Sequence, residues 1–83
     1  MNQYINTLIQ SVRNYTLPIL EEIMTEHYDA ELLPTIIKSR LLIEYAKDPR
    51  IEQVLDIAIT EEDEIYQVLT TIKAVNYNEP IEI

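Results

Sequence analysis

Apolar residues recur every three or four positions along the first part of the chain. Between residues 3 and 15 the apolar positions are Tyr4, Ile5, Leu8, Ile9, Val12 and Tyr15. This spacing predicts a helix with one buried side. A second helix is expected over residues 18–28, because Pro18 lacks an N–H and suits a first helical turn. One long helix kinked at Pro18 is the alternative.

The segment from residue 34 to residue 47 is apolar on nearly all sides of a helix. Its apolar positions are Ile36, Ile37, Leu41, Leu42, Ile43, Tyr45 and Ala46. A helix of this kind is buried between several neighbours or lies at an oligomer interface. We therefore expect it to be the central helix.

Asp48 and Pro49 form the clearest boundary in the chain. Asp is a good helix cap and Pro favours the first helical position. The pattern after them predicts a fourth helix over residues 49–58 and a fifth over residues 60–75. Thr60 would cap the fifth helix, with Asp63 three residues later.

These elements predict an all-α fold, a compact bundle of four or five short helices. The absence of glycine fits this expectation, since glycine is a poor helix former. Residues 1–75 would form a single helical domain. The tail, residues 76–83, would be either extended or frayed.

The charge of the chain restricts its possible binding partners more than its composition does. The chain has 15 acidic and six basic residues and a net charge of −9. Phosphate backbones and anionic lipids repel such a surface, so we expect neither direct nucleic-acid binding nor membrane binding. There is no cysteine and no apolar run of membrane-spanning length, and we expect no secretory leader. A soluble cytoplasmic protein is expected.

Four consecutive acids, residues 61–64, invite three interpretations. The simplest is the first turn of a helix, where the helix dipole favours negative charge. A calcium loop would need a glycine at its sharp turn, and the chain has none. A di-iron site would need two histidines, and His27 is the only one. We expect no metal.

Catalytic chemistry has little support in the sequence. Ser11 and Ser39 lack a nucleophile signature, and a single histidine leaves few ways to build a catalytic triad. Without glycine there is also no phosphate-binding loop. We expect neither enzymatic activity nor a cofactor.

The third interpretation uses two acidic tracts together as a nucleic-acid mimic. Side chains three or four positions apart on a helix lie about 5–6 Å apart, close to the roughly 6–7 Å between phosphates of one strand. Such a surface would inhibit or regulate a basic nucleic-acid-handling enzyme, as phage inhibitors and nuclease immunity proteins do. The partner-binding residues would be Glu61, Glu62, Asp63, Glu64, Tyr66, Glu21, Glu22, Glu26 and Tyr28.

The alternative hypothesis is a homo-oligomeric scaffold or ligand-sequestering protein assembled through the helix at 34–47. Four of the six cations fall between residues 38 and 50, where they could bind an anion or the acidic tract of a second copy. The residues for this alternative are Lys38, Arg40, Lys47, Arg50, Leu42 and Tyr45.

Overall fold

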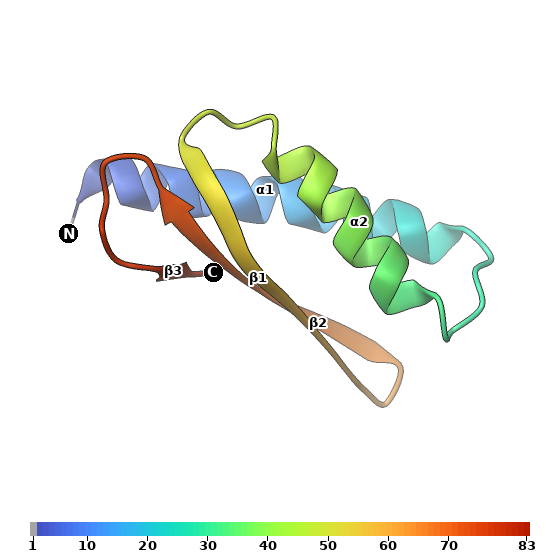
Figure 1. Cartoon of the computed structure of the whole chain (residues 1–83). Coiled ribbons are helices and arrows are strands. Elements are labelled where there is room, and N and C mark those ends of the chain that lie inside the picture. The colour runs from blue at the N-terminus through green and yellow to red at the C-terminus, as the bar shows by residue number, and fades with distance from the viewer. Residues whose placement is uncertain (1) are drawn as a thin grey trace.

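The computed structural model describes residues 2–83 as two helices followed by three strands (Figure 1). The elements are α1 (Gln3–Thr25), α2 (Leu33–Tyr45), β1 (Ile51–Glu62), β2 (Ile65–Ala74) and β3 (Ile81–Glu82). The strands form one antiparallel sheet in the order β1-β2-β3. The fold is therefore α+β, and the expected all-α bundle of four or five helices is wrong.

The predicted helices at 3–15 and 18–28 are one continuous helix. The side chain of Asn2 caps α1 by accepting a hydrogen bond from the amide of Tyr4 at 2.9 Å. Pro18 lies inside α1, so the continuous-helix alternative holds. Ile5, Leu8 and Val12 are buried, as the apolar spacing predicts.

The helix predicted at 34–47 is present as α2, two residues shorter at its carboxyl end. Pro34 lies in its first turn, where a missing N–H costs no hydrogen bond. Within residues 2–83 neither helix has the length and apolar character needed to cross a membrane.

The helix predicted at 49–58 is wrong because this segment is strand β1, and two irregularities explain the error. The register between β1 and β2 shifts between Ile51 and Gln53 and again between Val54 and Asp56. Each shift adds one residue to β1, so the positions that face the helices are 51, 54 and 57. This spacing of three between inward-facing residues resembles the apolar spacing of a helix.

The helix predicted at 60–75 is also wrong. This segment contains the end of β1, a tight turn and β2. In β2 burial alternates strictly, with even-numbered residues less exposed than their odd-numbered neighbours. That period of two is typical of a strand with one covered face. The expected tail, residues 76–83, ends in β3, which pairs with β2 beside Thr71 and Ile72.

The helices cover one face of the sheet, and the core lies between the two layers (Figure 1). Its centre is Tyr45 of α2, which is completely buried. The Tyr45 hydroxyl lies 2.6 Å from the hydroxyl of Thr16 in α1 and 3.1 Å from that of Thr70 in β2. These contacts link α1, α2 and β2, and they satisfy polar groups that burial would otherwise penalise.

Candidate functional site

The run Glu61–Glu64 forms the tip of the β1–β2 hairpin. Glu62 pairs with Ile65, so Asp63 and Glu64 alone make the turn. Their φ angles are 53° and 67°, in the left-handed region that a two-residue hairpin turn of this type requires. All four acids are exposed, and the tip projects away from the helical layer (Figure 1). The predicted helix start at Thr60 is therefore wrong.

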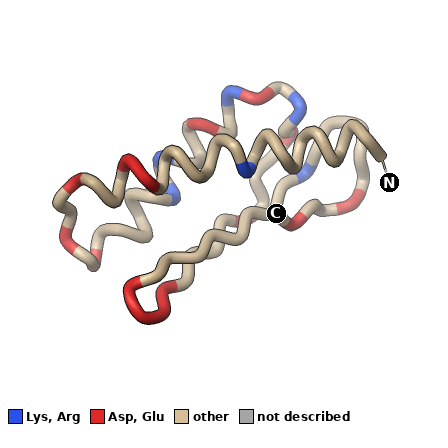
Figure 2. Tube along the Cα trace, turned by 180° about the vertical axis from the view of Figure 1, so that it is seen from behind, with Lys and Arg blue, Asp and Glu red and all other residues tan. Residues whose placement is uncertain are grey.

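The second acidic tract lies at the same end of the molecule as the hairpin tip (Figure 2). It spans the carboxyl-terminal part of α1 and the turn into α2. We call the two tracts together the acidic end, which consists of Glu21, Glu22, Glu26, Asp29, Glu31, Glu61, Glu62, Asp63 and Glu64. About 30 residues of sequence separate the two tracts, and the fold brings them to one end.

Most carboxylates of the acidic end have no cationic partner. Of its nine acids, only Glu22 forms an ion pair with a described residue, with Arg40 of α2 at 2.8 Å. The other eight acids of the acidic end are exposed and form no ion pair with a described residue. In the described chain, no three His, Asp or Glu side chains are grouped so that they could share a metal ion.

The two tyrosines predicted to contact a partner lie beside this surface, and both are half-buried. Tyr66 is the cross-strand neighbour of Glu61 on the sheet face that the helices cover. Tyr28 lies in the turn after α1, where interaction with the carboxylate of Glu26 raises the pKa of its hydroxyl. Each tyrosine thus borders one of the two acidic tracts.

Three of the four cations predicted to form a basic patch are used in ion pairs. Arg40 pairs with Glu22, Lys47 with Glu44 at 3.1 Å, and Arg50 with Asp48. Lys38 is exposed and forms no ion pair among the described residues. Little free positive charge remains there to bind an anion.

Asp48 organises the connection between α2 and β1. Its carboxylate accepts hydrogen bonds from the Arg50 backbone amide at 3.0 Å, from the Arg50 guanidinium, and from the Tyr15 hydroxyl at 2.7 Å. Hydrogen bonds from Arg50, more than any other cause, hold the pKa of Asp48 below its usual range. The predicted boundary at Asp48 is present, but Asp48 caps a turn that leads into a strand.

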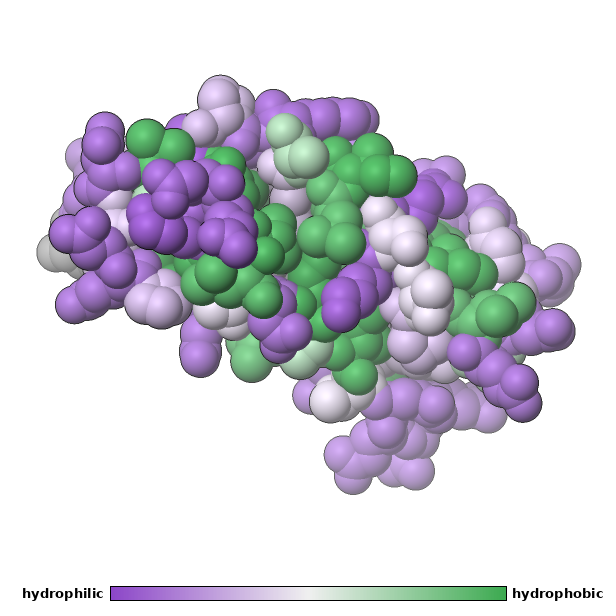
Figure 3. Space-filling view, in the orientation of Figure 1, coloured by the Kyte–Doolittle hydropathy of each residue, from purple (hydrophilic) through white to green (hydrophobic). Residues whose placement is uncertain are grey.

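The oligomer hypothesis requires exposed apolar residues on α2, and the structure meets this requirement only in part. Tyr45 is buried inside the core and does not reach the surface. Leu42 and Ile43 are 40% and 62% exposed, and apolar side chains gather over this part of the molecule (Figure 3). The hairpin tip below is hydrophilic in the same view.

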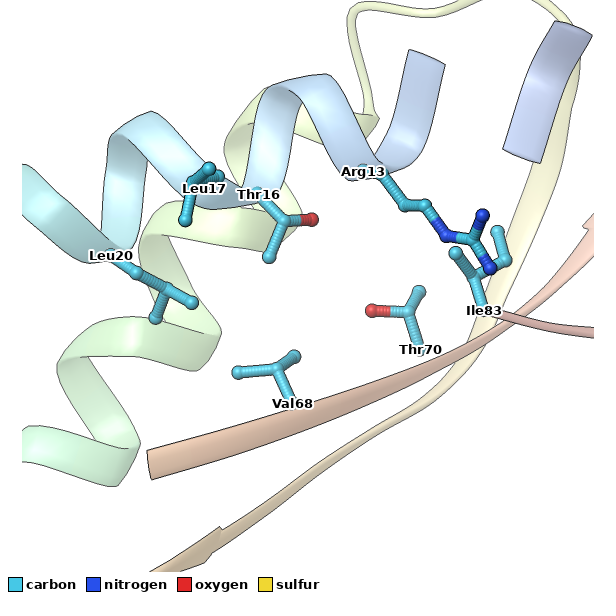
Figure 4. Close-up of a pocket in the computed structure, with 7 residues that line it drawn as sticks. All are labelled: Arg13, Thr16, Leu17, Leu20, Val68, Thr70 and Ile83. Carbon is cyan, nitrogen blue, oxygen red and sulfur yellow. The ribbon is translucent and has the colours of Figure 1, made fainter. Parts of the chain in front are cut away.

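A cavity that the sequence did not predict lies between α1 and the sheet (Figure 4). Its volume is about 220 Å³. Its lining comprises Arg13, Thr16, Leu17, Leu20, Val68, Thr70 and Ile83. The apolar residues Tyr66, Val68, Ile72 and Ala74 at even positions are the sequence signal that could have placed Val68 and Thr70 on the covered face of β2.

No protein-family model, no curated protein and no solved structure matches this chain.

Proposed function

We propose that this chain is a binding protein whose acidic end engages a basic surface on another macromolecule. The best-suited partner is a nucleic-acid-handling enzyme, such as a nuclease, because its basic groove already accommodates a row of phosphates. Occupying that groove would inhibit or regulate the enzyme without any chemistry by this chain.

The observation that supports the proposal most is the convergence of two acidic tracts at one end. Eight unpaired carboxylates there make a concentrated negative field, whereas all three acids between residues 44 and 52 form ion pairs. Exposed ion pairs are individually weak, commonly below about 1 kcal/mol. Many charges of one sign act together on the rate and selectivity of encounter with an oppositely charged surface.

The test is to isolate the partner from cells that produce the protein and to compare two triple variants. One carries Glu61→Gln, Glu62→Gln and Glu64→Gln at the hairpin tip. The matched control carries Asp56→Asn, Glu79→Gln and Glu82→Gln, which remove the same charge from exposed positions outside the acidic end. The tip variant should bind the partner at least about tenfold more weakly at low salt, and the control should stay close to the original protein.

Competition supplies the second part of this test. DNA or RNA should displace the protein from its partner, and rising salt should weaken the complex steeply. Equal losses in the two triple variants, or a partner that binds nucleic acid and this chain simultaneously, would contradict the proposal.

The exposed pair Leu42 and Ile43 favours one second candidate, a homo-oligomeric scaffold joined through α2. Association through apolar side chains resists salt, unlike association through charges. Light scattering distinguishes the two: a mass above 9.8 kDa that persists at high salt, and falls in a Leu42→Lys, Ile43→Lys variant, would support the scaffold.

A further inference from the structure

The outer edge of β2 is only partly occupied. β3 pairs with β2 near Thr71 and Ile72, and Ile83 exchanges both backbone hydrogen bonds with Thr70, at 2.7 and 3.1 Å. Beyond Thr70, toward the hairpin tip, no described strand lies on this side of β2. Among residues 2–83, the edge of β2 at Val68 and Tyr66 is therefore open.

The pairing pattern identifies which backbone groups this edge presents. In an antiparallel sheet, alternate residues direct their N–H and C=O groups to opposite sides of the strand. Because Thr70 directs these groups to β3, Val68 and Tyr66 direct theirs to the same side. Both residues have side chains on the face that the helices cover, since even-numbered residues of β2 are the less exposed ones, and Val68 lines the cavity beside α1.

The cavity lies beside this open edge and is of a size to hold one or two side chains. Figure 4 shows α1 above β2, with Leu17 and Leu20 facing Val68, and with Ile83 at one end. About 220 Å³ is less than the roughly 300–1,000 Å³ of pockets that hold drug-sized ligands. It suits one or two apolar side chains delivered by an extended strand.

Charge indicates what kind of strand fits. The open edge runs from Ile83 toward Glu64, so a strand placed there ends among the unpaired carboxylates of the hairpin tip. Basic residues at that end of the strand would complement them. A second copy of this chain is disfavoured, because each copy has a net charge of −9.

We propose that an extended segment of the partner protein adds to the sheet at Val68 and Tyr66, in line with β3. It inserts an apolar side chain between β2 and α1 and directs basic residues toward the hairpin tip. This is β-strand addition, in which backbone hydrogen bonds give affinity and a side-chain pocket gives specificity. The inference rests on the proposed function for the basic nature of the partner, and adds the manner of recognition.

The probe is a capped synthetic peptide of sequence Thr-Leu-Thr-Val-Lys-Lys, titrated into the full chain and followed by amide NMR shifts and calorimetry. Its second and fourth residues would pair with Val68 and Tyr66, and its lysines would reach the tip. N-methylation of those two residues should weaken binding at least about tenfold, because each loses a hydrogen bond to β2. N-methylation of the first and third residues should leave affinity within about twofold, since their amides point away.

Variants of the protein test the cavity separately. Leu17→Lys places a charge in the cavity wall at a position that is 59% exposed, so folding is preserved. Leu55→Lys adds the same charge at a 44% exposed position in β1 that does not line the cavity. The first should weaken peptide binding at least about tenfold and the second should not.

The outcomes separate this inference from the proposed function. If both N-methylated peptides bind equally, or if the original peptide does not shift the Tyr66 and Val68 amides, strand addition is overturned, whatever the acidic end binds. If the pattern of N-methylation holds but replacing the two lysines by glutamates leaves affinity unchanged, strand addition stands and the charge-based function fails.

Discussion

Asp48 shows how one buried carboxylate can fix a connection between a helix and a strand. It receives hydrogen bonds from both the backbone and side chain of Arg50 and from Tyr15, and only 5% of it is exposed. The same interaction with Asp48 raises the pKa of the Tyr15 hydroxyl. A buried charge that loses its partners is strongly destabilising, so these contacts are interdependent.

Asp48→Asn should lower the free energy of unfolding at pH 7 by about 2–3 kcal/mol, because the charged hydrogen bonds to Arg50 and Tyr15 weaken. The pKa of Asp48 is lowered in the folded state, so its contribution is complete above the unfolded pKa of about 3.9. The contribution is lost as pH falls from there through the folded pKa. Urea unfolding of both proteins over a pH series measures the difference.

The matched control for that experiment is Asp56→Asn. Asp56 is exposed in β1 and forms no ion pair among the described residues. Its replacement should change stability by no more than about 0.5 kcal/mol at any pH in the series. A loss for Asp48→Asn that stays constant down to the lowest pH would contradict the linkage.

At the scale of the elements, the helices follow from the sequence and the hairpin does not. The apolar spacing in α1 and α2 is regular, so it predicts both helices and much of their buried side. In β1 the two irregularities after Ile51 and Val54 give inward positions a spacing of three, which reads as a helix. The turn lacks the Asn-Gly or Asp-Gly pair that usually marks a hairpin. Only the alternation in β2 favoured a strand.

The hairpin turn carries a conformational cost that a glycine would remove. Glu64 has a φ of 67°, and a left-handed conformation costs a residue with a side chain about 1–2 kcal/mol. Glu64→Gly should therefore raise the free energy of unfolding by about 0.5–1 kcal/mol, after allowing for the greater flexibility of unfolded glycine. The midpoint of urea unfolding reports the change.

Glu62→Gly is the control, because it removes the same charge two positions earlier, outside the turn. Glu62 lies in β1, where glycine destabilises a strand by roughly 0.5–1 kcal/mol. The two variants should thus change stability in opposite directions. The same sign in both would mean that charge, and not backbone conformation, dominates at the tip.

At the scale of the whole molecule, the sequence indicated the two acidic tracts but not that they lie at the same end. The two tracts were identifiable as runs of acids, and the structure brings them to one end (Figure 2). Helical carboxylate spacing does not apply to Glu61 and Glu62, because neighbouring strand residues point to opposite faces. Arg40 of α2 pairs with Glu22 of α1, which a one-dimensional charge count does not reveal, whereas the pairs Lys47–Glu44 and Arg50–Asp48 are local in sequence.

The most direct test of the acidic end is an NMR titration of the isotope-labelled protein with an oligolysine peptide at low salt. Amide shifts should concentrate at residues 21–31 and 61–64 and disappear at high salt. Exposed acids elsewhere, Asp56, Glu79 and Glu82, should respond much less. Shifts of equal size at all exposed acids would contradict a single concentrated binding surface, as would shifts that centre on another part of the molecule.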